Sequence, residues 1–458
     1  MTFELSRKLR GRLRSWERNL VCASALLVLS AGGATAQAPV PFWRVARLSG
    51  AALGCLDGRT EAELEVVACR DTCAPIPWQL DERDADGEWA LPDGPEPNPD
   101  DPRGTVDAND ELLWMAADAG RRLRPGEAPA DAGCAVEIEL RAEGGSSWVY
   151  AFAVRAPAPR SPVRYVEYDP LHDTVRAARV AIGFGAPTPR YLALRDADGQ
   201  SGPNLLDRLK VRASARFFGL IPLGRDEDDI QWEFVAWHAG PIRVVRSERQ
   251  WVRLGWGLRT PIFRTESFVY RDYLELPVRL RLNFPPTYFF SGIEVQAALD
   301  FRDLRGWALR APQGPLGTVG AMPEDVRRGV NGLDGNWLAL EGPTVTLVLR
   351  LQLGDTFASL RHQLLYREDA DGYAPEAAPG EHPAVGFRLT EWGRVDRGNH
   401  WFAAVATALP AGYDLDAFVR DDAAPLAVDA HPLPVEPRAA TPPARASGHG
   451  GTRPHGGS

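Results

Sequence analysis

The sequence predicts an all-β protein in which a small N-terminal β-sandwich is followed by a large antiparallel β-sandwich, with few and short helices. Three observations support this prediction. The chain has 458 residues with 44 glycines and 39 prolines, long helical patterns are scarce, and apolar and polar residues alternate repeatedly along its central part. A chain of this length can form two sizeable cores, so we expect two folded regions.

Residues 1–36 have the pattern of an export signal. Basic residues come first, the apolar run "VCASALLVLS" follows, and the small residues "ATA" precede Gln37. The apolar run of about 15 residues is shorter than the roughly 20 residues that span a bilayer. We therefore expect cleavage, a periplasmic or secreted protein, and no stable membrane span afterwards. A retained anchor is the alternative.

Residues 37–157 are predicted to form an acidic β module with disulfides. Its cysteines are Cys55, Cys69, Cys73 and Cys134. An even number of cysteines in an exported chain indicates disulfides, and four allow three pairings. Zinc is the rival interpretation, but the spacing in "CRDTC" and the absence of histidine between Cys55 and Cys134 match no common zinc finger. Strands are expected at 42–48, 62–70, 75–82, 111–118, 135–142 and 147–155.

Residues 158–420, which begin within the proline-rich connector "RAPAPRSP", are predicted to form the large β-sandwich. The stretches "LPVRLRLNF" and "TVTLVLRLQL" alternate with period two, which is typical of strands with one buried and one wetter face. Short helices are expected near residues 324 and 414. Residues 421–458 are poor in large apolar side chains and are predicted to be disordered. Further strands are expected at 163–168, 175–184, 211–220, 230–237, 242–256, 276–284, 293–301, 337–342, 344–353, 359–367, 385–392 and 400–409.

The tetrapeptide "DADG" begins at Asp84, Asp196 and Asp369. Asp-Gly favours a tight turn, because glycine adopts positive φ without steric cost. The second and third copies follow apolar-rich stretches and lack the later glutamate of a calcium loop, so we interpret them as turns.

The first copy lies in a strongly acidic segment. Residues 81–118 hold 13 carboxylates against two arginines, and such charge is unfavourable unless it is solvated or neutralised. Calcium binds six to eight oxygens. The segment therefore predicts Ca²⁺ as a cofactor, and a solvated acidic loop is the alternative. The candidate ligands are Asp84, Asp86, Asp107, Asn109, Asp110 and Glu111.

The stretches "IPWQLDERDADGEW" and "DANDELLWMAADAG" resemble a motif of uncharacterised exported bacterial proteins, in which an "IPxQ" strand leads through an acidic turn to an "NDEL" strand. They are also similar to segments of families associated with polysaccharide breakdown. The resemblance covers Ile76 to Gly120, about a tenth of the chain. It implies a module and not a reaction. Trp78, Leu80, Leu112, Trp114 and Ala116 are expected to face inward from two paired strands.

Composition excludes some functions. The formal charge of −9 argues against nucleic-acid binding, which needs a clustered basic face. The chain contains no "GxSxG", "GxxxxGK" or "HExxH" motif and no Rossmann glycine set. Lys8 and Lys210 are its only lysines, and neither lies in a phosphate-binding motif.

Scattered polar and aromatic residues are the remaining candidates for a site. Whether the protein is an enzyme stays open. We expect a cell-envelope β-sandwich that binds a polysaccharide or other envelope glycan or has a structural role; the alternatives are a polysaccharide lyase or glycoside hydrolase, and a surface-assembly protein. The catalytic candidates are Glu233, His238, Tyr270, Asp272 and His400, and the ligand-binding candidates are Trp237, Tyr273 and Trp401.

Overall fold

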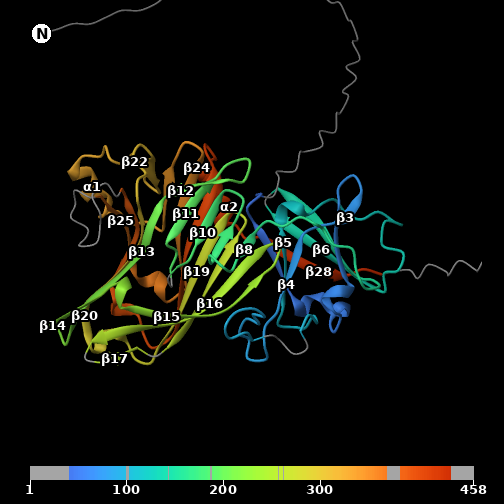
Figure 1. The fold of residues 1–458 in the computed structure, drawn as a ribbon, viewed down its shortest axis with the longest axis horizontal. Coiled ribbons are helices and arrows are strands. Elements are labelled where there is room, and N and C mark those ends of the chain that lie inside the picture. The colour runs from blue at the N-terminus through green and yellow to red at the C-terminus, as the bar shows by residue number, and fades with distance from the viewer. Residues whose placement is uncertain are drawn as a thin grey trace, which may run out of the picture. The chain divides into compact units, whose positions relative to one another are not determined.

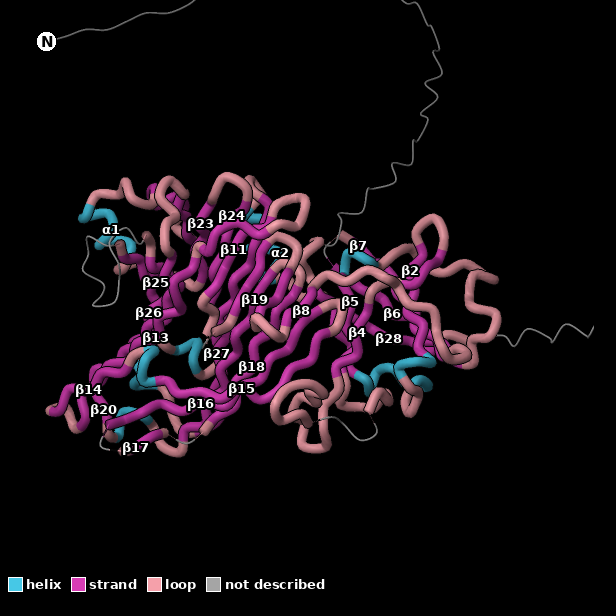
Figure 2. The backbone as a smooth tube through the Cα atoms, viewed as in Figure 1, coloured by secondary structure: helices cyan, strands magenta, loops and turns pink. Residues whose placement is uncertain are grey.

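A computed structural model describes residues 41–98, 103–142, 144–185, 188–255, 257–260, 262–368 and 382–434, all within the unit Ala38–Ser458. The predicted export signal and the third "DADG" copy lie outside these residues. Antiparallel sheets make up most of the described chain, which confirms the all-β prediction (Figures 1 and 2). No helix among these residues is long and apolar enough to cross a bilayer.

The N-terminal region is a two-sheet sandwich. The first sheet has the order β1 (Val45–Ser49), β5 (Glu111–Met115), β4 (Trp78–Asp81). The second has the order β28 (Ala427–Pro432), β6 (Cys134–Ala142), β7 (Gly145–Ala153), β2 (Leu64–Cys69), β3 (Cys73–Pro75). Both sheets bury side chains in one apolar core. Trp78 pairs with Trp114 and Leu80 with Leu112, and all four are buried, as the alternation predicted.

Two disulfides join Cys55 to Cys134 and Cys69 to Cys73. The sequence left three pairings open, and the structure selects this one. Cys134 begins β6, Cys69 ends β2 and Cys73 begins β3.

The predicted disordered tail is wrong for its first part. Residues 415–423 form helix α2 (Leu415–Ala423), and β28 follows and pairs with β6 of the N-terminal sandwich. The strand has few large apolar side chains because it lies at a sheet edge, where backbone hydrogen bonds to β6 supply its partner. Composition alone could not show this long-range pairing.

The large region contains three sheets. The largest has the order β15, β16, β18, β19, β27, β24, β23, β21, β22, with β17 paired to β16. The second has the order β12, β11, β10, β9, β8, and the third β14, β13, β20, β26, β25. Their bounds are β8 Glu167–Asp169, β9 Thr174–Arg176, β10 Val180–Gly183, β11 Tyr191–Arg195, β12 Ser201–Asn204, β13 Leu206–Phe217, β14 Ile221–Arg225, β15 Ile230–Ala239, β16 Arg243–Gly255, β17 Leu258–Arg259, β18 Phe263–Tyr270, β19 Tyr273–Leu282, β20 Phe290–Phe301, β21 Ala308–Ala311, β22 Gly314–Thr318, β23 Trp337–Glu341, β24 Val345–Leu353, β25 Arg361–Arg367, β26 Ala384–Thr390 and β27 Gly398–Pro410.

The predicted short helix near residue 324 is α1 (Glu324–Val330). The short 3₁₀ turns are η1 Gly50–Leu56, η2 Glu61–Glu63, η3 Ala116–Asp118, η4 Glu227–Asp229, η5 Pro286–Tyr288, η6 Phe357–Ser359 and η8 Trp392–Arg394.

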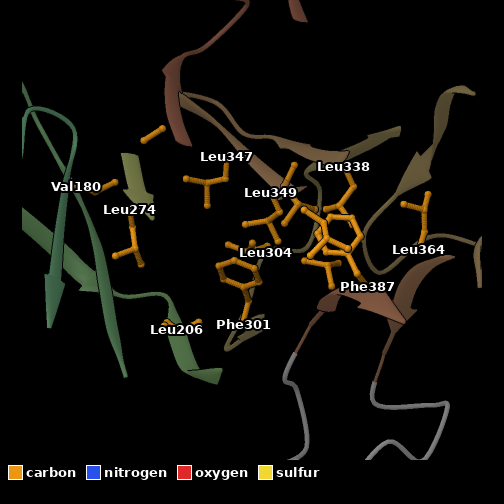
Figure 3. Packing of buried hydrophobic residues seen from close by; sticks show 14 of the residues in the cluster. Val180, Leu206, Leu274, Phe301, Leu304, Leu338, Leu347, Leu349, Leu364 and Phe387 are labelled. Atoms are coloured by element: carbon orange, nitrogen blue, oxygen red, sulfur yellow. The ribbon is translucent and has the colours of Figure 1, made fainter. Parts of the chain in front are cut away.

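One apolar core joins the three sheets of the large region. It contains Val180 of the second sheet, Leu347 and Leu349 of the largest sheet, and Phe387 of the third (Figure 3). Strand β24 departs from its prediction, because Val348, on the face expected to be wetter, is also buried. It packs in a second cluster with Trp43 and with Phe418 of α2.

The first and second "DADG" copies form the same kind of turn. Gly87 and Gly199 have φ values of 81° and 78°. In each turn the glycine N–H donates to the carbonyl of the leading aspartate, Asp84 or Asp196. The second copy was predicted to be a turn, and the first has the same backbone in spite of its acidic surroundings.

Candidate functional site

A cleft of about 600 Å³ lies on the face of the largest sheet that points away from the apolar core. This volume is in the range of small-molecule sites. Its walls combine the two regions of the chain, with β1 and the segment 83–111 on one side and β16, β18, β19 and β27 on the other. The residues that line it are Arg47, Arg83, Trp89, Glu111, Arg243, Phe268, Tyr270, Glu275, Pro277, Arg279, Leu280, Arg281, Asn399, His400 and Trp401.

Strand alternation places the cleft side chains on one face. On β19, Leu280 and Leu282 pack against the core, so Arg279 and Arg281 point to the opposite face. On β27, Trp401 pairs with Arg279 and Asn399 with Arg281. Residues directly opposite each other in an antiparallel pair lie on the same face. The alternation in "LPVRLRLNF" therefore puts two arginines beside an aromatic ring.

Tyr270 lies at the bottom of the cleft. Arg47 Nη2 donates to its hydroxyl oxygen at 2.6 Å and Arg243 Nη1 at 2.8 Å. These two bonds occupy both lone pairs of the phenol, so its O–H remains able to donate. Burial raises the pKa of Tyr270 and the Arg243 guanidinium opposes this shift. The side chain is therefore a neutral phenol at neutral pH.

Arg243 joins the large sheet to the N-terminal region. It is fully buried, its Nε donates to Asp81 at 2.5 Å and its Nη2 to Glu111 at 3.1 Å. Burial alone would lower the pKa of Arg243, but the Asp81 carboxylate and other neighbours more than offset this and raise it. Trp89 and Phe268 rings lie 4.7 and 5.0 Å from its guanidinium carbon. The cleft floor thus depends on contacts across the two regions.

Gln79, the glutamine of the "IPxQ" strand, makes the neighbouring contact. Its Oε1 accepts hydrogen bonds from the backbone N–H groups of Ile242 and Arg243, at 3.0 and 2.9 Å, and its Nε2 donates to Asp81 at 2.7 Å. A Cβ on Gly240 would lie 2.0 Å from Gln79 Oε1. Only glycine allows this approach, so the motif that resembles exported bacterial proteins serves here to dock the N-terminal region on β16.

The cleft is positively charged although the chain is acidic. Five arginines and two glutamates line it, whereas the formal charge of the chain is −9. Glu111 and Glu275 are engaged by arginines of the same cleft. Arg279 and Arg281 are exposed, and Arg279 also acts on the buried Glu266 carboxyl, whose pKa it lowers against the raising effect of burial. Two cationic groups are therefore available to a ligand.

Trp401 provides an aromatic surface at the same place. Its side chain is 47% exposed. A Cβ on Gly354 would lie 2.5 Å from Trp401 Nε1, so the indole rests directly on the Gly354 backbone. A side chain at position 354 would clash with the indole, so glycine is needed there for the ring to take this position.

A second cavity of about 370 Å³ adjoins the first, and Arg47 and Glu275 line both. Tyr273 lines this second cavity, and its ring stacks on Tyr270 with centroids 4.2 Å apart. The C-terminal segment closes one side through Asp422, Leu426 and Val428. Arg350 forms an ion pair with Asp422 there.

Of the predicted candidates, Tyr270, His400 and Trp401 line the cleft, and Tyr273 lines the adjoining cavity. The His400 ring stacks on Phe357 of the core with centroids 5.0 Å apart, and its Nε2 bonds the Asp396 carbonyl at 2.9 Å. It therefore contributes to the cleft mainly from beneath.

The other four predicted residues do not line either cavity. Glu233 is exposed on β15 beside Arg249. Asp272 is fully buried and pairs with Arg179, and burial raises its pKa to about 6. The strand register aligns Glu233 with Arg249 and Arg249 with Arg264. Asp272 is eight residues farther along the chain than Arg264. The carboxylates of Glu233 and Asp272 are therefore more than roughly 20 Å apart, which is too far for a glycosidase pair.

His238 and Trp237 lie next to the cleft. His238 Nε2 is 3.4 Å from Asp81 Oδ1, so it contacts the carboxylate that holds Arg243. Trp237 packs edge-on against Tyr168 with centroids 4.8 Å apart. Both residues belong to β15, which pairs with the strand that carries Arg243, and neither lines the two cavities described above.

The proposed calcium ligands are arranged in two adjoining turns. Asp84 Oδ1 accepts from the N–H groups of Asp86 and Glu88. Asp110 Oδ2 accepts from Asp107 N–H at 2.8 Å, and Asn109 Nδ2 donates to the Asp84 carbonyl at 3.1 Å. Burial raises the pKa of Asp110 to about 7. Within the described residues, the grouped metal-ligand atoms are those of Cys69, Cys73 and Glu127, where the sulfurs form a disulfide. Calcium stays a prediction.

The sequence prediction missed the cleft arginines and Glu275, and it assigned Glu111 to calcium. Arg279 and Arg281 carried a usable signal, because they alternate with leucines on a predicted strand beside aromatic residues. Arg47, Arg83 and Arg243 carried none. They come from distant segments, and only the docking of the two regions brings them together.

No family model and no curated protein matches this chain. Among solved structures, it is similar to an alpha-mannosidase from Enterococcus faecalis V583, with 8% identity, a TM-score of 0.42, and coverage of 86% of this chain and 45% of that one. A glycosyl hydrolase family 38 protein from Enterococcus faecalis matches with 8% identity, a TM-score of 0.41, and coverage of 85% and 44%. The chain thus spans less than half of either protein, and this degree of likeness transfers neither an activity nor a site.

Proposed function

We propose that this protein binds an anionic glycan, a sugar chain that bears carboxylate or sulfate groups, in the cleft between its two regions. The observation that carries the proposal is the cleft lining of five arginines with an exposed tryptophan, in a chain of net negative charge. Arginine suits carboxylates and sulfates because its planar fork of donors matches two oxygens.

The arrangement of the exposed groups supports this ligand class. Arg279 and Arg281 are two residues apart on β19 and thus about 7 Å apart along the strand. Trp401 is paired with the first of them. A sugar ring stacked on the indole would have its acidic group within reach of one arginine, and the next residue of the sugar chain would reach the other.

Glycan cleavage is the second candidate function. Glu111 and Glu275 lie on opposite walls of the cleft, one from each region, and Tyr270 has a hydroxyl that can donate a proton. A carboxylate pair across a glycosidic bond is what a glycosidase needs. Both glutamates are held by arginines, however, so binding without cleavage is the simpler expectation.

Affinity electrophoresis tests the proposal. The protein is run in gels that contain polygalacturonate or chondroitin sulfate, with neutral dextran as the reference polymer. Retardation by the anionic polymers alone, weakened by added salt, is expected because exposed charges are screened. Arg279→Ala combined with Arg281→Ala, and separately Trp401→Ala, should each abolish the retardation.

Arg328→Ala is the matched control, since Arg328 is an exposed arginine on α1, outside the cleft. Equal retardation by dextran, or retention of binding in both cleft variants, would refute the proposal. The same polymers incubated with the protein and assayed for reducing ends and for unsaturated products decide between binding and cleavage.

A further inference from the structure

We propose that the tip formed by the β13–β14 turn and the β19–β20 connection inserts into the surface of an anionic lipid bilayer. This inference does not rest on the glycan proposal, because none of the tip's apolar residues lines the cleft. Figure 1 shows β13, β14 and β20 running together toward one end of the ribbon.

The tip gathers most of the exposed apolar side chains. Among the described residues, eleven large hydrophobic side chains are exposed; five of them belong to these two connections, and a sixth, Ile221, begins β14. Leu220 is 80% exposed, Tyr288 68% and Phe218 63%. The six residues are Phe218, Leu220, Ile221, Phe284, Tyr288 and Phe289. A monomer that keeps such a patch normally uses it for contact with a partner or a membrane.

The two connections form a single rigid unit. Phe218 N–H donates to the Phe289 carbonyl at 2.8 Å, and their rings have centroids 5.8 Å apart. Phe289 also packs edge-on against Phe284 at 4.9 Å. Since the rings brace one another while their outer surfaces stay exposed, the exposure is built into the fold.

The turn itself is strained in order to present an aromatic ring. Phe218 and Gly219 have φ values of 47° and 74°, and Leu220 N–H donates to the Phe217 carbonyl at 3.0 Å. A turn with two central residues at positive φ favours Asn-Gly, and a bulky side chain there is costly. A costly residue that gains no burial indicates a function for the side chain.

The charge around the tip favours an anionic bilayer over a second copy of this acidic chain. Two of the nearby arginines, Arg279 and Arg281, line the cleft, and the acidic run 226–229 follows β14 at its end away from the turn. Arg212 and Arg225 pair with Glu227 and Asp229 behind the tip, whereas Arg216 is exposed next to it. Apolar side chains in the acyl region and arginines at the headgroups are the two forces that hold peripheral proteins on anionic membranes.

Vesicle co-sedimentation tests this inference. The full chain is mixed with phosphatidylcholine vesicles that contain phosphatidylglycerol, and with vesicles of phosphatidylcholine alone. We expect binding to the mixed vesicles and weaker binding to the neutral ones. Phe218→Asn and Leu220→Ser should each weaken binding by about tenfold or more, because each removes a large apolar group from the bilayer.

Phe218→Asn also separates binding from folding. Asn-Gly suits this turn, so the melting temperature of this variant should stay the same or rise while lipid binding falls. Leu171→Ser is the matched control, since Leu171 is 85% exposed in the β8–β9 turn, and it should bind as the wild type does. Absence of vesicle binding, or equal loss in the control, overturns the inference. So does a concentration-dependent dimer that the tip substitutions abolish, which would identify a second copy as the occupant.

Discussion

Two arginines on strand β16, Arg243 and Arg246, have the same burial and different consequences. Both are fully buried, but they lie on opposite faces of the largest sheet. Arg246 binds Glu248, two residues away on the same strand, and Asp173. Arg243 binds Asp81 and Glu111, which are 162 and 132 residues away in the sequence.

The comparison shows that burial alone does not decide the role of a buried arginine. Its role depends on whether its carboxylate partners come from the same region of the chain or from the other one. On the Arg246 face, burial raises the pKa of Glu248 to about 7 although Arg246 lowers it, so this carboxyl can become neutral at little cost. On the Arg243 face, the carboxylates come from the other region of the chain and hold the cleft floor. Arg243 is therefore a junction residue, while Arg246 satisfies charges within the large region.

Of the substitutions that test this comparison, Arg243→Met should have the largest effect on stability. It leaves Asp81 buried without its cation, and the loss of one partner of a buried pair costs about 3–5 kcal/mol. Urea unfolding should show this decrease in the free energy of unfolding, together with loss of retardation by polygalacturonate. A change below about 1 kcal/mol would show that the two regions dock without this residue.

Arg246→Met should have a smaller effect, about 2 kcal/mol, because Glu248 can take up a proton when its cation is removed. Glycan binding should be unchanged, since Arg246 does not line the cleft. The same urea experiment and gel assay check both expectations. Equal losses for the two arginine variants would contradict the proposed difference.

Gly240→Ala tests the same junction at the contact between Gly240 and Gln79. The new Cβ would meet Gln79 Oε1 at 2.0 Å, which displaces Gln79 from the Ile242 and Arg243 N–H groups and should cost about 2 kcal/mol. Gly224→Ala is the control, because nothing lies within 4 Å of a Cβ at Gly224. Calorimetric melting temperatures of the two variants should differ clearly, and equal values would rule out the close approach.

A pH dependence is also expected from the Arg246 face. Glu248 has a raised pKa of about 7 in the folded protein, so between pH 4.5 and 7 the folded state holds a proton that the unfolded state releases. Its contribution to stability is therefore present at low pH and is lost as the pH rises through 7. Glu248→Gln should remove most of the fall in unfolding free energy over this window, up to about 3 kcal/mol for a shift of this size, and an unchanged slope in urea titrations would count against it.

Much of the fold could be predicted from local pattern. Trp78, Leu80, Leu112 and Trp114 were expected to face inward, and they do. The helices near residues 324 and 414 were found in place. These features depend on side-chain periodicity and turn chemistry, which a short stretch of sequence contains in full.

The site was predicted in fragments. Four predicted site residues line the cleft or the adjoining cavity: Tyr270, Tyr273, His400 and Trp401. No spatial partner for the carboxylates of Glu233 and Asp272 could be inferred from the sequence, and the structure does not bring these two together. Glu111 was assigned to calcium because its neighbours in the sequence are acidic, whereas its neighbours in space are Arg83 and Arg243. Electrostatic partners are set by distance in space, which a local reading of charge does not give.

The sequence by itself therefore determined an all-β chain, its strand faces and its turns, because these follow from the chemistry of residues close together along the chain. The tertiary structure decided the return of β28 to the N-terminal sheet, the disulfide pairing and the gathering of five arginines in one cleft. Each of these joins segments far apart in sequence, and such contacts form only when whole sheets pack and bury their surfaces together.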